Sequence, residues 1–127
     1  MKAPSSGPRA GGPSHGGRPT ADTGLRLLYV TTAKLDEAWS IGETLVTERL
    51  AACANVLPAM QSCFWWEGKL ERANECVLIL KTRQTLVESA VQRVRELHSY
   101  AVPCVVAVPV TGGNPDYLAW IESTTQG

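Results

Sequence analysis

The chain has 127 residues, enough for one domain, and its 12 basic and 12 acidic side chains leave no net charge at neutral pH. This balance argues against a dedicated nucleic-acid-binding surface, which needs a concentration of Lys and Arg. No apolar run is long enough to span a membrane, so neither nucleic acid nor a membrane is expected as a partner.

Residues 1–24 contain six Gly, four Pro and three Ser, and no apolar residue larger than Ala after Met1. Such a composition cannot form a packed core, so we predict a disordered arm here and a folded domain over 25–127. The arm has no apolar stretch that could serve as a secretory signal, which favours a cytoplasmic location. Because the arm has few acidic residues, an organellar transit peptide is the alternative, although Gly and Pro oppose the amphipathic helix of such peptides.

The first half of the domain reads as a strand, a helix and a bent strand. The strand covers about 25–32, and an amphipathic helix follows over about 35–51. Gly42 lies in the middle of this helix, where Gly costs about 1 kcal/mol relative to Ala. A close contact between the helix and the sheet would explain why glycine stands at this position. An extended segment over about 54–66 contains Pro58, which predicts an edge strand with a bend.

The second half repeats this pattern. Glu67–Gly68 predicts a tight turn into a strand over 69–82. Thr85 and Glu88 have the spacing of a capping box, which predicts the start of a second amphipathic helix. A last strand is expected over about 104–110.

Residues 114–116, Asn-Pro-Asp, predict the start of a short final helix, with Asn as its cap. The complete order is strand, helix, strand, strand, helix, strand and short helix. This order fits a ferredoxin-like α+β fold, in which a βαββαβ chain forms one antiparallel sheet. Right-handed connections place both long helices on the same face of that sheet.

Three strand segments are apolar on both faces: 27–30, 77–80 and 105–108. Alternate side chains of a strand point to opposite faces, so both faces of this sheet need cover. The two long helices cover only one face, which leaves the other bare. We therefore expect identical subunits to cover it.

Three consecutive aromatic residues, Phe64, Trp65 and Trp66, precede the predicted turn. They place large rings on both faces of an edge hairpin, which would be an aggregation hazard if left exposed. We predict that they form a subunit interface. The alternative is that the hairpin folds back on its own sheet.

The four cysteines do not form a Cys-x-x-Cys pair, which argues against a zinc ribbon or a thioredoxin-type motif. Without a secretory signal, we expect them to be free, buried thiols. They are Cys53, Cys63, Cys76 and Cys104.

Five short segments in this chain resemble the CutA family of divalent-ion tolerance proteins, in order and at the expected spacing over about 25–124. The segments are Glu48–Asn55, Trp66–Lys69, Leu80–Thr82, Leu97–Tyr100 and Gly113–Trp120.

The resemblance implies a ferredoxin-like subunit and a homotrimer in which the second and third strands reach neighbouring subunits, an assembly like that of PII-type regulatory proteins. It also implies a role in tolerance of divalent metals, notably copper. We expect no required cofactor, with Cu2+ or another divalent metal as a possible ligand. The chain departs from the family pattern after His98, where Ser99 and Ala101 replace Pro and Glu, and at Cys104, where an acidic residue is common.

The predicted metal ligands are Cys53 and His98, since thiolate and imidazole suit copper or another divalent metal. The alternative is structural. Cys53 then packs as a small apolar side chain, and His98 caps the end of its helix.

An enzyme is not expected, because the domain has no phosphate-binding loop and no assembled catalytic triad. The alternative function is a PII-like signalling or scaffold protein that binds a small effector between subunits. Ionisable or polar-tipped residues at the motif positions are candidates for that effector cleft. They are Glu67, Lys69, Lys81, Tyr100, Asp116, Tyr117 and Trp120.

Overall fold

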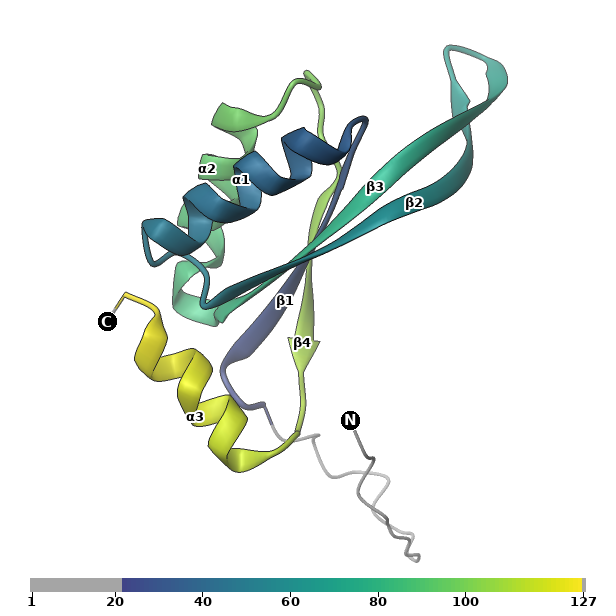
Figure 1. Ribbon diagram of the computed structural model, residues 1–127. Coiled ribbons are helices and arrows are strands. Elements are labelled where there is room, and N and C mark those ends of the chain that lie inside the picture. The colour runs from purple at the N-terminus through teal and green to yellow at the C-terminus, as the bar shows by residue number, and fades with distance from the viewer. Residues whose placement is uncertain (1–21, 127) are drawn as a thin grey trace, which may run out of the picture.

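The computed structural model describes residues 22–126, and its elements follow the predicted order (Figure 1). A short 3₁₀ helix, η2, precedes the second α-helix. Within the described range, no helix is both long enough and apolar enough to cross a membrane. The elements are β1 (Leu25–Thr32), α1 (Leu35–Thr47), β2 (Cys53–Trp66), β3 (Lys69–Arg83), η2 (Gln84–Leu86), α2 (Val87–Leu97), β4 (Val105–Val110) and α3 (Pro115–Thr124).

Most of the predicted arm, residues 1–21, lies outside the described residues. Residues 22–24, which the sequence assigns to the arm, are bonded to the domain. Asp22 forms an ion pair with Arg26 at 2.9 Å, and the Thr23 hydroxyl donates to the carbonyl of Val110 at 2.6 Å. The domain therefore includes these three residues as well.

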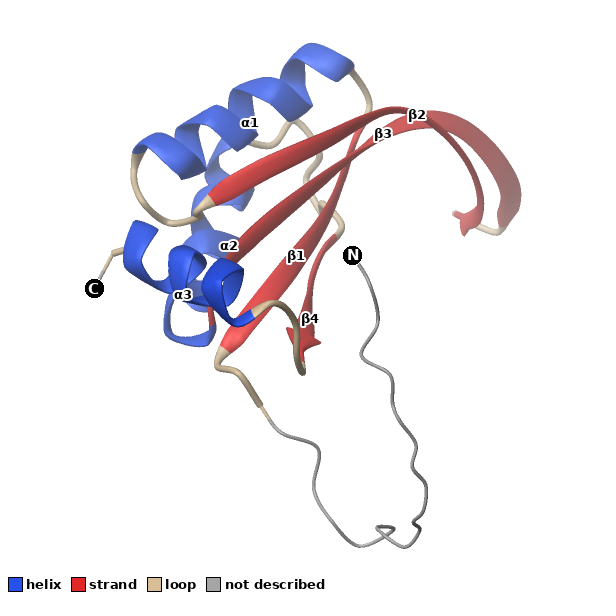
Figure 2. Ribbon diagram, turned by 60° about the horizontal axis from the view of Figure 1, so that its bottom comes forward, coloured by secondary structure: helices blue, strands red, loops and turns tan. Residues whose placement is uncertain are grey.

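The four strands form one antiparallel sheet in the order β2-β3-β1-β4, and α1 and α2 lie on one of its faces (Figure 2). Leu28 and Val30 of β1 lie opposite Leu80 and Leu78 of β3, and all four side chains are fully buried. They form one core cluster with Leu45 of α1. This arrangement confirms the predicted ferredoxin-like α+β fold.

Helix α1 approaches the sheet most closely at Gly42. A Cβ atom at this position would lie 2.9 Å from the Cβ of Ala54 and 3.0 Å from the Cδ1 of Leu78. The close contact predicted from the mid-helix glycine is therefore present. The helix ends at Thr47, earlier than predicted, because Arg49 adopts a left-handed φ of 64° and turns the chain towards β2.

The helix starts agree with the sequence at α3 and differ from it at α2. The Asn114 side chain accepts the backbone N–H of Asp116 at 3.1 Å, as expected of a cap. Thr85, in contrast, lies inside η2, and no side chain caps α2. The capping box predicted from Thr85 and Glu88 is wrong, because the 3₁₀ helix runs directly into α2 through Leu86.

Strands β2 and β3 form a long, curved hairpin that extends well beyond β1 and β4 (Figure 1). The predicted bend at Pro58 is present as a shift in register between Leu57 and Met60. The thiol of Cys76 donates to the freed Pro58 carbonyl at 3.3 Å. The tight turn at Glu67–Gly68 is confirmed by φ angles of 50° and 80°.

The second face of the sheet is not bare along its whole length, because α3 covers one end of it. Ile121 of α3 packs against Leu25, which points away from α1 and α2. The remainder of this face still exposes apolar side chains. Val106 of β4 is 51% exposed, Val108 is 45% exposed, and Leu57 of β2 is 52% exposed. One subunit therefore leaves part of its sheet uncovered.

We expect Gly42→Ala to destabilise the domain by about 1–2 kcal/mol, because overpacking against Ala54 and Leu78 outweighs the higher helix propensity of Ala. Urea unfolding at a fixed protein concentration measures the difference. Gly112→Ala is the matched control, since no atom lies within 4 Å of the added Cβ. A Gly42→Ala variant as stable as the native chain would contradict the close contact.

Candidate functional site

His98 ends helix α2 with its ring fully buried and both ring nitrogens hydrogen-bonded. Nε2 lies 2.7 Å from the carbonyl oxygen of Thr31, which can only accept, so Nε2 carries the hydrogen. Nδ1 accepts the backbone N–H of Tyr100 at 3.0 Å. The Glu37 carboxylate is 3.7 Å from Nδ1 and accepts the N–H of Ser99 at 2.7 Å. The ring therefore holds the segment after α2 against β1, and neither nitrogen caps the helix.

Cys53 lies at a different part of the sheet. It begins β2 opposite Lys81, and Lys81 lies opposite Leu27 of β1. His98 bonds the same strand at Thr31, four residues further on, or about 13 Å along the strand. One subunit therefore does not bring the two predicted copper ligands together.

Three of the predicted effector residues do lie together, beside Cys53. The Lys81 ammonium donates to the Tyr117 hydroxyl at 3.0 Å and lies 5.2 Å from the centre of its ring. The Trp120 ring stacks on Tyr117 at 5.5 Å between centroids, and the Cys53 sulfur is 3.9 Å from the same hydroxyl. Asp116 belongs to the same turn of α3.

Lys81 keeps its positive charge in this cluster. Partial burial alone would lower its pKa, but the hydrogen bond to Tyr117 and the attraction of Cys53 outweigh that effect and raise the pKa above its usual value. No carboxylate of residues 22–126 pairs with this ammonium within 4 Å. The cluster therefore offers a cation beside a stacked aromatic pair, which suits an anionic ligand with an aromatic group.

Tyr100 lies elsewhere, in a groove of about 870 Å³ on the concave side of the hairpin. Its hydroxyl donates to Glu75 at 3.3 Å, and the Ser62 hydroxyl donates to the same carboxylate at 2.7 Å. Burial and the nearby Glu75 raise the pKa of Tyr100. Glu75 is half-buried and accepts both of these hydrogen bonds. Only the fold brings these three residues together, so no sequence pattern identifies them as a group.

The remaining predicted residues lie at the hairpin tip. Glu67 forms the turn and Lys69 follows it, far along the hairpin from the Lys81 cluster. Phe64, Trp65 and Trp66 are 40%, 73% and 58% exposed. The predicted effector residues are thus distributed over three places in one subunit, and the aromatic residues are free to contact another copy.

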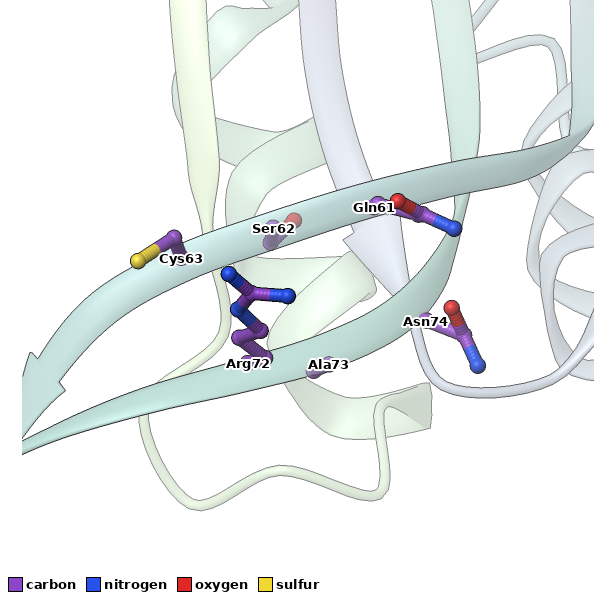
Figure 3. A pocket seen from close by; sticks show the side chains of 6 residues that line it. All are labelled: Gln61, Ser62, Cys63, Arg72, Ala73 and Asn74. Carbon is purple, nitrogen blue, oxygen red and sulfur yellow. The ribbon is translucent and has the colours of Figure 1, made fainter.

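The convex side of the hairpin carries a second, polar hollow of about 570 Å³ (Figure 3). Gln61 lies opposite Asn74, and Cys63 lies opposite Arg72. Alternation along β2 places Gln61 and Cys63 on the same side as Trp65. The aromatic tip therefore presents rings on both sides of the hairpin, with Trp65 convex and Phe64 and Trp66 concave.

The four cysteines are all free, as the sequence predicts. They are not uniformly buried, however. Cys76 is buried and Cys53 is half-buried, whereas Cys63 and Cys104 are exposed. Among residues 22–126, no group of three or more His, Cys, Asp or Glu side chains is arranged to hold a metal ion.

The chain is similar to known proteins over almost all of this domain. The sequence model of the CutA1 divalent ion tolerance protein family matches residues 26–124. This chain is 40% identical to the divalent-cation tolerance protein CutA of Archaeoglobus fulgidus and 40% identical to the chloroplastic protein CutA of Arabidopsis thaliana. Each match extends over 100 residues, which is 79% of this chain. Those stretches are 97% of the archaeal protein and 55% of the plant protein, so this chain spans about half the length of its plant relatives. The crystal structure of CutA from Xylella fastidiosa superimposes with a TM-score of 0.79 at 39% identity, covering 81% of this chain and 99% of that one.

We expect His98→Ala to destabilise the domain by about 2–4 kcal/mol, because it opens a cavity and leaves the Thr31 carbonyl and the Tyr100 amide without partners. Chemical unfolding measures the loss. Ser99→Ala removes a neighbouring exposed side chain and serves as the control. Unchanged stability of His98→Ala would show that the ring is not a structural link.

Proposed function

Because the chain belongs to the CutA1 divalent ion tolerance protein family, we propose that it acts in cellular tolerance of divalent cations as a non-enzymatic, trimeric protein. The family match over residues 26–124 supports this proposal directly. Its archaeal and Thermus relatives are named divalent-cation tolerance proteins, which is not the name of an enzyme. A cytoplasmic location stays a prediction, and two plant relatives bear the name chloroplastic.

Self-association is supported by the apolar surface that one subunit exposes. Trp65 and Trp66 lie at the end of a hairpin beside which residues 22–126 place no other strand. Val106 and Val108 lie on the uncovered face of β4, which is also an edge strand. Burying the two indole rings alone would contribute on the order of 5 kcal/mol per subunit before the costs of association. A hairpin of this length is suited to reach a neighbouring copy.

Copper is the cation for which the sequence predicts ligands, Cys53 and His98. The single subunit does not fit such a site, since these residues lie apart and both nitrogens of His98 have protein partners. Cys53 remains the accessible soft ligand of the two. Copper binding by Cys53 and His98 thus stays a prediction, and binding at Cys53 would need further ligands from another copy.

A second candidate function is effector binding, as in PII-type proteins. The observation that favours it is the Lys81 ammonium beside the stacked rings of Tyr117 and Trp120. An effector would bind in the presence of a chelator and would lose affinity in a Lys81→Gln variant. A thermal-shift screen of anionic metabolites with EDTA present separates this function from metal binding.

We expect the native chain to be a trimer by light scattering after gel filtration, and Trp65→Ser with Trp66→Ser to weaken this assembly at least about tenfold. Trp39→Ser is the control, because this exposed tryptophan lies on α1, away from the hairpin. A native chain that elutes as a monomer would contradict the proposal. An equal loss of assembly in both variants would contradict the interface.

We expect deletion of the protein to lower the copper concentration that its source cells tolerate, with growth restored by the native chain. Calorimetric titration of copper into the purified protein then tests the ligands. Cys53→Ser should weaken binding about tenfold or more if the thiol is a ligand. Cys63→Ser and Cys104→Ser control for adventitious binding at exposed thiols. Unaltered growth after deletion contradicts the tolerance role, whereas unaltered titration of Cys53→Ser contradicts only the ligand.

A further inference from the structure

Helix α1 exposes a tryptophan on the side of the molecule that faces away from the sheet. Trp39 is 47% exposed, and Leu35, one turn earlier, is 43% exposed. The helix packs on the sheet through a different stripe, which includes Ala38, Ile41 and Leu45. Packing within the domain therefore does not account for the Trp39 ring, which is large, apolar and open to solvent.

The ring lines a groove of about 660 Å³ that runs along α1 towards Arg93 of α2. Arg93 is the lining residue that α2 contributes. Its guanidinium donates to both carboxylate oxygens of Glu48, at 2.9 and 2.8 Å, and to Glu96 at 3.1 Å. This two-point contact ties the end of α1 to α2 and holds that wall of the groove in place.

The groove carries an excess of negative charge, because Arg93, which also lines it, is already bound to Glu48 and Glu96. Asp36 and Glu43 lie three residues before and four residues after Trp39, so the three side chains share one side of the helix. Segment 35–47 contains no Lys or Arg. Neither carboxylate forms an ion pair with any of residues 22–126, whereas Glu48 is already paired with Arg93.

We propose that this groove binds an arginine-bearing segment of a partner protein. A guanidinium stacks on the exposed indole face and donates hydrogen bonds to the carboxylates of Asp36 and Glu43 on either side. Leu35, one turn before Trp39 on α1, adds an exposed apolar side chain next to the groove. Each part of the ligand thus meets a group of matching chemistry.

Charge complementarity selects this occupant over the others. An apolar segment would cover Asp36 and Glu43 without giving them hydrogen-bond partners, which is costly. A second copy that used the same helix face would bring two more free carboxylates against them. A basic segment removes both penalties.

The groove is also separate from the surface proposed for self-association. It lies on the helix layer, whereas the uncovered apolar face belongs to the opposite side of the sheet (Figure 2). The inference therefore does not rest on the proposed function, and the two can fail independently.

Fluorescence anisotropy with a labelled glycine-serine peptide carrying several arginines tests the proposal on the full chain. The matched probe replaces each arginine by citrulline, which keeps the shape and removes the charge. We expect the arginine peptide to bind at least about tenfold more tightly at low salt. Trp39→Ala, and Asp36→Asn with Glu43→Gln, should each weaken it about fivefold or more. Equal binding of the two peptides would overturn the proposal.

The double variant Glu88→Gln with Glu122→Gln is the charge control, since it removes two exposed carboxylates outside this groove. It should change affinity by less than about twofold. A loss as large as that of the Asp36 and Glu43 variant would show only diffuse attraction and would overturn the site. Trp39→Phe keeps an aromatic ring and should bind between native and Trp39→Ala. If circular dichroism shows that Trp39→Ala is misfolded, Trp39→Phe and Trp39→Leu are compared instead. Native affinity in both of these variants would overturn the stacking contact.

Discussion

Strand β1 is apolar on both faces, and the remainder of the subunit is arranged around this constraint. Leu28 and Val30 point to one face and are buried beneath α1 and α2. On the opposite face, Leu25 is covered by α3, and the hydroxyl of Tyr29 donates to the sulfur of Met60 at 3.3 Å. The helix pair α1 and α2, helix α3 and Met60 of the hairpin thus each cover part of β1. The cover is incomplete over β4, where an apolar surface remains.

The bend in β2 both helps to cover β1 and directs the hairpin away from the sheet, where another copy can contact it. The register shift after Leu57 lets the hairpin bring Met60 over β1 and then extend beyond the sheet. The buried thiol of Cys76 satisfies the carbonyl of Pro58 that the bend frees from the ladder. Because no strand in the described part of the chain lies beside the hairpin beyond Cys76, its aromatic tip is directed outward. A local break in strand pairing therefore determines where an oligomer can form.

The segment after α2 is held by side chains rather than by regular secondary structure. His98 bonds β1, and Glu37 of α1 accepts the amide of Ser99. Tyr100 then reaches Glu75 of the hairpin. These bonds attach the segment after α2 to β1, to α1 and to the hairpin. His98, although it stands at a family motif position, thus has a structural role here. A ligand site is therefore better sought at the Lys81 cluster.

Much of the fold could be predicted from the sequence. Periodicity and turn residues determined the order of the elements, the bend at Pro58 and the cap at Asn114, because each depends on residues close together in the chain. The mid-helix Gly42 also predicted a close approach of helix and sheet. Motif spacing over the domain was sufficient to suggest the family that the comparison established.

Only the tertiary structure decided which distant groups meet. It placed α3 on the second face of the sheet and separated His98 from Cys53. It also joined Lys81 to Tyr117, 36 residues away. Periodicity specifies which side of its own element a residue occupies, but contact between elements depends on strand register, packing angle and side-chain reach. Those quantities are set when the core closes, and no local pattern in the sequence contains them.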